Sequence, residues 1–208
     1  MLCTLQLHAQ LHVSSKKSPG SFAIFSPADA PTILYDVADD SLVRIASHLF
    51  QQDVQNVSGK ILPVANSLGL SKNIILIGSL QKSRFIQQLV AEKKLSVTPI
   101  RNKWEGYKIQ VVKAPFKGVA QALVIVGSDR RGAAFGTFEL SQLIGVSPWY
   151  WWADVPVKKS SQLYVQPGSV LVDSPRVKYR GIFINDEAPA LSNWSRSTFG
   201  GFNHKFYE

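Results

Sequence analysis

Apolar positions between residues 21 and 146 follow two periods that alternate along the chain. Alternating or continuous apolar residues in six short segments predict strands at 21–27, 33–37, 60–65, 73–78, 107–112 and 122–127. Apolar residues at helical spacing between these strands predict helices at about 39–58, 85–90 and 131–144. Strands that alternate with helices are typical of a layered α/β domain. We expect such a layered domain, with a mixed sheet, over residues 20–146.

Capping residues mark the ends of the longer helices. Asp39 or Asp40 can cap the start of the first helix, and Gly59 ends it. Gly145 ends the last helix in the same way. The segment 73–78 (NIILIG) is apolar throughout, which predicts a strand that is buried on both faces.

The pattern changes after residue 146. Residues 147–174 are rich in Pro, Trp, Lys and Ser, and only a short strand is expected there, near 162–165. We expect residues 166–176 to be a linker. A second unit, 177–208, opens with VKYRGIFIND (177–186), which reads as a strand that ends in polar residues.

The last residues predict a helix that has only begun. Asn203 is a good N-cap, and His204–Glu208 would form little more than one turn. An isolated helix needs about 12–15 residues to be even marginally stable. We therefore expect a truncated chain whose second domain continues.

Composition and charge exclude several classes of protein. The chain has 208 residues, of which 45% are hydrophobic, so it is globular but too short for a complete (β/α)₈ barrel beside another domain. No apolar run reaches the roughly 20 residues that span a bilayer. Cys3 is the only cysteine, which excludes an intrachain disulfide and a multi-cysteine zinc site.

The net charge of +9 comes from 23 basic and 14 acidic residues, and the basic residues are scattered in ones and twos. Because they form no stripe and accompany no nucleic-acid-binding motif, we expect no nucleic-acid partner. Residues 1–20 form a lead-in, and Met1–Gln10 (MLCTLQLHAQ) resembles the end of a clipped secretory signal. The alternative is a plain first strand over Leu5–Val13. We expect a secreted or periplasmic protein.

A glycine-rich turn, GSDRRGAAFG (127–136), connects an apolar strand to a helix. Such turns can bind phosphate at the helix N-terminus, but this spacing fits neither the P-loop nor the dinucleotide-binding fingerprint. The favoured interpretation is a tight turn at Gly127, a cap at Asp129, and close packing of the helix at Gly132 and Gly136.

Aromatic residues gather in PWYWWAD (148–154). Adjacent Trp and Tyr rings can form a platform on which sugars stack, or they can fill an interface between domains. For a connecting segment we favour packing between domains.

Three polar residues, Asn185, Asp186 and Glu187, follow the apolar run 181–184. Carboxylates at the end of a strand occupy the place where catalytic groups gather in α/β barrels, and two adjacent carboxylates can shift each other's pKa. A helix cap with a solvated neighbour is the equally weighted alternative. The four histidines are dispersed, without the spacing of metal ligands, and only His204 is a candidate for a site.

Two segments, GSDRRGAAFGTFELSQLIGVSPWYWWADVPV (127–157) and YRGIFINDEAPALSNWSRSTFGGFNHKFYE (179–208), together resemble glycoside hydrolase family 115. That family consists of inverting xylan α-1,2-(4-O-methyl)glucuronidases. The resemblance extends from about residue 21 to the end of the chain. It implies an α/β fold in which a non-catalytic, layered N-terminal domain with a mixed sheet, residues 21–165, is followed by the start of a truncated (β/α)₈ barrel, residues 177–208.

The resemblance also implies roles for individual residues. Asp186 and Glu187 would be catalytic, as acid/base or hydroxyl-orienting groups, and the other carboxylates of the inverting pair would come from later strands. Asn185, Trp194, Asn203 and His204 would bind substrate. No metal and no cofactor is expected.

The implied partner is glucuronoxylan or its oligosaccharides, without a membrane span, and with dimerisation only in a full-length form. We expect the 208-residue chain alone to be inactive, because one barrel strand cannot close a barrel. The alternative is a free-standing α/β carbohydrate-binding or interaction domain without catalysis. A nucleotide-binding protein is the third hypothesis, and the failed glycine spacing argues against it.

Overall fold

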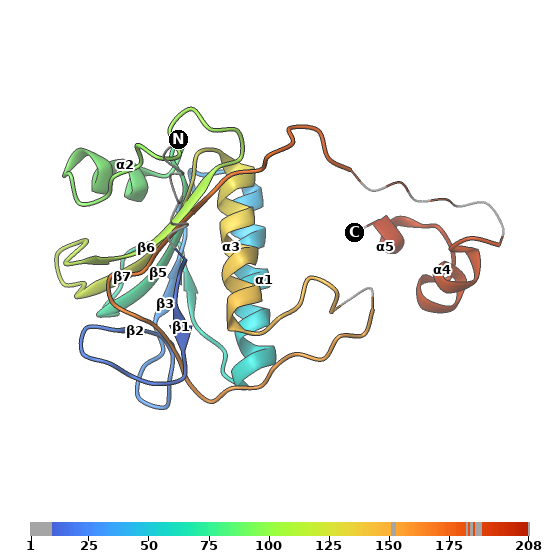
Figure 1. Cartoon of the computed structure of the whole chain (residues 1–208), viewed down its shortest axis with the longest axis horizontal. Coiled ribbons are helices and arrows are strands. Elements are labelled where there is room, and N and C mark those ends of the chain that lie inside the picture. The colour runs from blue at the N-terminus through green and yellow to red at the C-terminus, as the bar shows by residue number, and fades with distance from the viewer. Residues whose placement is uncertain (1–9, 151–152, 182, 184, 186–188, 208) are drawn as a thin grey trace, which may run out of the picture. The chain divides into compact units, whose positions relative to one another are not determined.

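A computed structural model of the chain describes residues 10–150, 153–181, 183, 185 and 189–207 (Figure 1). The chain divides into two compact units, residues 1–175 and 176–208.

The most apolar segments of the first unit form the centre of a six-stranded mixed sheet (Figure 1). β5 (Asn73–Ser79) and β7 (Gln121–Gly127) are parallel neighbours over their full lengths. β3 (Thr32–Leu34) and β4 (Val64–Ala65) continue the parallel part beyond β5. β6 (Tyr107–Lys113) pairs antiparallel with β7 on the other side. The layered α/β fold with a mixed sheet is therefore confirmed.

Helices cover both faces of this sheet. α1 (Ser41–Ser58) and α3 (Arg130–Ile144) lie side by side on one face (Figure 1). Ile75 and Ile77 of β5 pack in the core below them, whereas Leu76, between these two, packs with α2 (Arg84–Ala91) in a second core. Successive side chains of a strand point to opposite faces, so both faces of β5 are buried as predicted.

The predicted helix ends are also found. Asp40 occupies the N-cap position of α1 but its side chain makes no capping hydrogen bond, and Gly59 adopts the left-handed conformation after the last turn. Gly145 ends α3 in the same way. The left-handed conformation strains residues that carry a Cβ, and glycine adopts it without that cost.

A second, three-stranded antiparallel sheet joins distant parts of the sequence. β8 (Leu163–Val165) lies between β1 (Val13–Ser14) and β2 (Phe22–Phe25). Phe22 and Val165, which are register partners, are both buried in the core below α1 and α3.

The prediction that residues 166–176 form a linker is wrong for part of this segment, because it contains strand β9 (Val170–Asp173). β9 pairs antiparallel with β6 and is the last strand of the six-stranded sheet, with Tyr107 opposite Asp173. The free edge of β6 supplies the hydrogen-bonding partner that a short apolar segment needs to become a strand.

The described residues of the second unit form two helices, α4 (Ser192–Phe199) and α5 (His204–Tyr207), and α5 begins after Asn203 as predicted. The strand expected at 177–186 is wrong for the residues that the structure describes there, which form no strand. A strand requires a hydrogen-bonded neighbour, and none of the described strands pairs with this segment. That this unit begins a barrel stays a prediction.

Candidate functional site

The two predicted catalytic residues, Asp186 and Glu187, lie outside the described residues. Asn185, directly before them, is exposed. Their assignment to a sugar-binding subsite stays a prediction.

Trp194, a predicted substrate-binding residue, belongs to an aromatic cluster within the second unit. Its ring meets those of Phe199 and Phe206 edge to face, with centroid distances of 5.3 and 5.8 Å. Phe206 is buried and also contacts Phe202 at 4.9 Å. Edge-to-face pairs of this kind stabilise a small core. Trp194 thus has a packing role, and sugar binding by its ring stays a prediction.

Asn203 and His204 lie at the start of α5. The Asn203 side-chain amide donates a hydrogen bond to the Phe199 carbonyl at 2.7 Å, which satisfies a carbonyl at the end of α4. His204 is exposed on the first turn of α5. The structure therefore brings Trp194, Asn203 and His204 together around the α4–α5 connection.

Two of the aromatic residues in 148–154 are described. Trp149 and Tyr150 are exposed in a turn, where the Trp149 N–H donates a hydrogen bond to Ser147 Oγ at 3.1 Å. Trp151 and Trp152 lie outside the described residues. Packing between domains by this segment stays a prediction.

The glycine-rich turn packs as predicted. Asp129 caps α3, because its Oδ1 accepts a hydrogen bond from the Gly132 N–H at 2.8 Å. A Cβ on Gly132 would lie 2.3 Å from the Gly106 carbonyl oxygen, and one on Gly127 would lie 2.0 Å from the Ala133 nitrogen. These glycines therefore allow close packing of backbone on backbone, and the Asp129 carboxylate occupies the helix N-terminus where a phosphate would bind.

Beside this turn lies a cavity of about 400 Å³, which we call the sheet-end cavity. Its walls come from four connections at one end of the sheet. The lining residues are Asp40, Gln81, Lys82, Trp104, Glu105, Asp129, Arg130 and Arg131. Three of these connections follow the carboxyl ends of the parallel strands β3, β5 and β7, and the fourth precedes the antiparallel strand β6. Ligands of open α/β sheets bind at the carboxyl ends of parallel strands.

Charged groups of the sheet-end cavity are arranged in pairs. Asp40 contacts Lys82 Nζ at 3.1 Å and Arg130 Nη1 at 3.4 Å. A hydrogen bond from Lys82, and a weaker one from Arg130, hold the pKa of Asp40 below its usual value. Glu105 Oε1 lies 2.8 Å from Arg131 Nε, which makes an ion pair. The cavity can therefore offer cationic groups, anionic groups and an indole face to one ligand.

The sheet-end cavity was not predicted from the sequence. The sequence features that could have indicated the cavity are the polar loops directly after the apolar strands β5 and β7, and Trp104 shortly before strand β6. The sequence does not show that these loops converge, because their lining residues are up to 91 positions apart, from Asp40 to Arg131.

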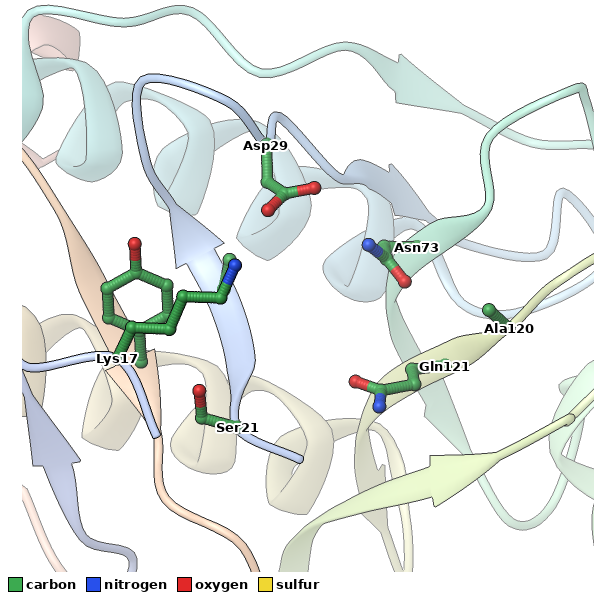
Figure 2. Close-up of a pocket in the computed structure, with 8 residues that line it drawn as sticks. Lys17, Ser21, Asp29, Asn73, Ala120 and Gln121 are labelled. Carbon is green, nitrogen blue, oxygen red and sulfur yellow. The ribbon is translucent and has the colours of Figure 1, made fainter. Parts of the chain in front are cut away.

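A second cavity, of about 220 Å³, lies at the amino ends of β5 and β7. Figure 2 shows Lys17, Asp29, Asn73 and Gln121 around it. These side chains are polar, and Tyr164, the aromatic residue of its lining, is buried. This cavity can form hydrogen bonds but presents little aromatic surface.

Neither a metal site nor a membrane-spanning helix is found in the part of the chain that the structure describes. No group of three or more His, Cys, Asp or Glu residues is placed to hold a metal there. None of the helices there is long and apolar enough to cross a membrane.

Comparisons with known proteins point to one family. The profile of glycosyl hydrolase family 115 matches residues 172–208. A solved family GH115 4-O-methyl-α-glucuronidase with specificity for decorated arabinogalactans is 31% identical, with a TM-score of 0.70 over 88% of this chain and 22% of that one. CpGH84D shares the fold at 11% identity, with a TM-score of 0.52 over 89% of this chain and 26% of that one. No curated protein matches the sequence.

This chain spans about a fifth of the length of that glucuronidase, 22%. The profile match covers the segment that holds Asn185, Trp194, Asn203 and His204. Together with the shared fold, it confirms the resemblance inferred from the sequence: the chain is related to glycosyl hydrolase family 115.

Proposed function

We propose that this chain is part of a glycoside hydrolase that removes (4-O-methyl)glucuronic acid from xylan by inverting hydrolysis. The match of residues 172–208 to the family 115 profile carries the proposal. The structural similarity to a 4-O-methyl-α-glucuronidase, which covers 88% of this chain, also supports the proposal.

The chemistry needs two carboxyl groups. In an inverting glycosidase one protonates the leaving oxygen while the other activates a water molecule on the opposite face of the sugar, with about 6.5–9.5 Å between them. Asp186 and Glu187 are the proposed contributors from this chain, because they follow the apolar run 181–184 within the matched segment. Asn185 and His204 are proposed to bind sugar hydroxyls.

The test is hydrolysis by the natural protein that contains this chain, isolated with an antibody against residues 10–150. Proton NMR would follow its action on xylo-oligosaccharides that carry α-1,2-linked 4-O-methylglucuronate. Release of the uronate, first as the β anomer, is expected because inversion converts an α linkage into a β product. An α product at early times would contradict the proposed mechanism, and absence of release would contradict the proposed reaction.

The choice of xylan is tested in the same assay. The similar glucuronidase is named for decorated arabinogalactans. We expect faster release from the xylan oligosaccharide than from a glucuronate-decorated arabinogalactan. The reverse order would overturn the xylan assignment and leave glucuronate removal in place.

We also propose that the protein is exported, to the medium or the periplasm. The support is the Leu-rich segment that ends in His8-Ala9-Gln10, which resembles the last part of a secretory signal. Fractionation of the producing cells, followed by immunoblotting with the same antibody, tests this. Recovery of the protein with the cytosol would contradict it.

A further inference from the structure

The cavity of about 220 Å³ at the amino ends of β5 and β7, which we call the amino-end cavity, is lined by residues of both sheets. Asn73 and Gln121 are the first residues of β5 and β7 and are register partners, so their side chains leave the same face of the large sheet side by side. From the small sheet, the register partners Ala23 and Tyr164 line the same cavity. Each sheet therefore supplies one wall.

Several polar side chains of the amino-end cavity lack a protein partner. Among the residues that it describes, the structure gives no hydrogen bond and no ion pair to the side chains of Lys17, Asp29, Asn73 and Gln121. Figure 2 shows these side chains around one space. All but Lys17 are half-buried. Half-buried polar groups need water or a ligand as a partner, because desolvation without a hydrogen bond is costly.

The unpartnered groups offer donors and acceptors together. Each of the two carboxamides supplies two N–H donors and one acceptor oxygen, whereas Lys17 only donates and Asp29 only accepts. The charges of Lys17 and Asp29 cancel, so the lining residues carry no net charge. A matching ligand is therefore neutral overall and has several groups that both donate and accept.

A sugar ring meets these requirements, because each of its hydroxyl groups donates one hydrogen bond and accepts others. Neighbouring strands lie about 4.7–4.9 Å apart, so two carboxamides in register can bind two hydroxyls of one ring. The cavity volume of about 220 Å³ equals that of roughly seven water molecules at about 30 Å³ each, which is the size of a single ring rather than of a chain.

Other classes of ligand fit less well. Phosphate and carboxylate groups accept hydrogen bonds without donating them, and Asp29 would repel both. An apolar ligand would desolvate the two carboxamides without giving them partners. A free amino acid could pair its two charges with Lys17 and Asp29, but these residues lie in loops, and the carboxamides of the two central strands would stay unused.

We propose that the amino-end cavity is a non-catalytic binding site for one neutral sugar ring. The carboxamides of Asn73 and Gln121 bind adjacent hydroxyls of the ring, and Asp29 accepts a hydrogen bond from a further hydroxyl. The lining residues all belong to the first unit, and none of them is assigned to catalysis. The class of ligand follows from the cavity alone, and the choice of a xylan fragment as probe rests on the proposed function.

The experiment is a titration of the isotope-labelled 208-residue chain with xylotriose, followed by NMR through the side-chain NH₂ signals of Asn73 and Gln121. We expect both sets of signals to shift together and to saturate at the same concentration. High salt should leave the half-saturating concentration unchanged, because neither the probe nor the lining carries a net charge. Absence of a saturable shift would overturn the proposal.

Three further probes test the class of ligand. Tetrahydropyran keeps the ring without hydroxyl groups, L-alanine is a zwitterion, and inorganic phosphate is an anion. Each should require a concentration at least about tenfold higher than xylotriose for half-saturation, because each leaves several carboxamide hydrogen bonds unmade. Binding of any of the three as tightly as xylotriose would overturn the assignment to a sugar.

Variants locate the binding. Asn73→Leu and Gln121→Met keep the approximate size of the side chain and remove its hydrogen-bonding groups. Each should weaken xylotriose binding about three- to tenfold, measured on the remaining carboxamide. The temperature of unfolding should stay the same or rise, because neither side chain has a protein hydrogen bond to lose among the described residues. The matched controls are Asn66→Leu and Gln142→Met, which change exposed carboxamides outside the cavity.

Unchanged affinity in both cavity variants, or an equal loss in both controls, would overturn the proposal. Asn73→Asp is a second variant in case Asn73→Leu does not fold, and it should also weaken binding because it removes two donors. Failure of the proposed function would be distinguishable, because hydrolysis is measured on the natural protein and binding on the 208-residue chain. If cellotriose binds as tightly as xylotriose, the sugar site stands and only the xylan probe loses its special status.

Discussion

The Asp129 carboxylate accepts a hydrogen bond from the backbone N–H of Glu105, with 3.0 Å between Oδ2 and N. Its other oxygen caps α3 through the Gly132 N–H at 2.8 Å. One side chain therefore links the start of α3 to the turn that follows Trp104, where Glu105 has a φ of +52°. The position of the sheet-end cavity depends on this link.

Asp129→Ala should lower the free energy of unfolding by about 1–2 kcal/mol, because it removes a helix cap and leaves the Glu105 N–H without this acceptor. Urea unfolding followed by circular dichroism measures the change. Asp129→Asn should lose less, since the amide oxygen can still accept one hydrogen bond. Equal stability of the wild type and the alanine variant would contradict the structural role given to Asp129.

Gly132→Ala should destabilise the first unit by about 1–3 kcal/mol, because the new Cβ would lie 2.3 Å from the Gly106 carbonyl oxygen. Alanine is more favourable than glycine in a helix by about 1 kcal/mol, so a Gly→Ala change at a helical position without the clash would raise stability. Gly69→Ala is the matched control, since a Cβ there meets nothing within 4 Å. Thermal unfolding of both variants tests this prediction. A stabilised Gly132→Ala variant would show that α3 packs less closely than described.

We expect the ion pair of Asp36 to make the protein less stable in acid. Its side chain has 0% exposure and accepts hydrogen bonds from the Arg84 guanidinium, the closest at 2.7 Å from Nη2 to Oδ1. Hydrogen bonding to Arg84 lowers the pKa of Asp36 below its usual value. The unfolded state therefore binds this proton more readily, so the stabilisation is present above the ordinary pKa of about 3.9 and is lost as the pH falls through the lower, folded value.

Asp36→Asn should consequently be less stable than the wild type at pH 6, by about 1–3 kcal/mol, and should lose less further stability between pH 5 and pH 3. Urea midpoints across this range test the prediction. A variant whose stability falls as steeply as that of the wild type would show that other carboxylates cause the acid effect.

Local sequence patterns were sufficient for the long elements of the first unit. Asp40 and Gly59 bracket α1, and the apolar runs beginning at Asn73 and Gln121 became the central strands. In these cases one physical cause, burial or capping, acts within a few residues of the chain. Such causes can be inferred from neighbouring positions alone.

Other elements depend on distant partners. β1 pairs with β8, where Val13 lies opposite Val165, and no local pattern identifies that partner. β9 is a strand because the edge of β6 is available, which the composition of 166–176 does not indicate. The predicted strand over 177–186 has an apolar pattern but no paired neighbour among the described residues. The sheet-end cavity was missed for the same reason, since its walls converge only after the sheet has formed.

Phe206→Ala should disrupt the aromatic cluster of the second unit, because Phe206 contacts Trp194, Phe199 and Phe202. Large-to-small changes at a buried Phe typically cost about 3–5 kcal/mol in a complete core, and a small cluster has less stability to lose. We expect faster hydrogen exchange in α4 and α5, with unchanged exchange in β5 and β7. Lys205→Ala, an exposed change on the same helix, is the control. Unchanged exchange in Phe206→Ala would contradict a stabilising role for the cluster.

The most direct test of the proposed hydrolase is the turnover of Asp186→Asn in the natural protein that contains this chain, with glucuronate-bearing xylo-oligosaccharides as substrate. An acid/base or positioning carboxylate typically contributes about 10²–10⁴-fold to the rate. We therefore predict a loss of turnover of that order with substrate affinity changed only a few-fold. Near-normal turnover in a variant that merely unfolds at a lower temperature would identify Asp186 as a capping residue and contradict its place in the active site.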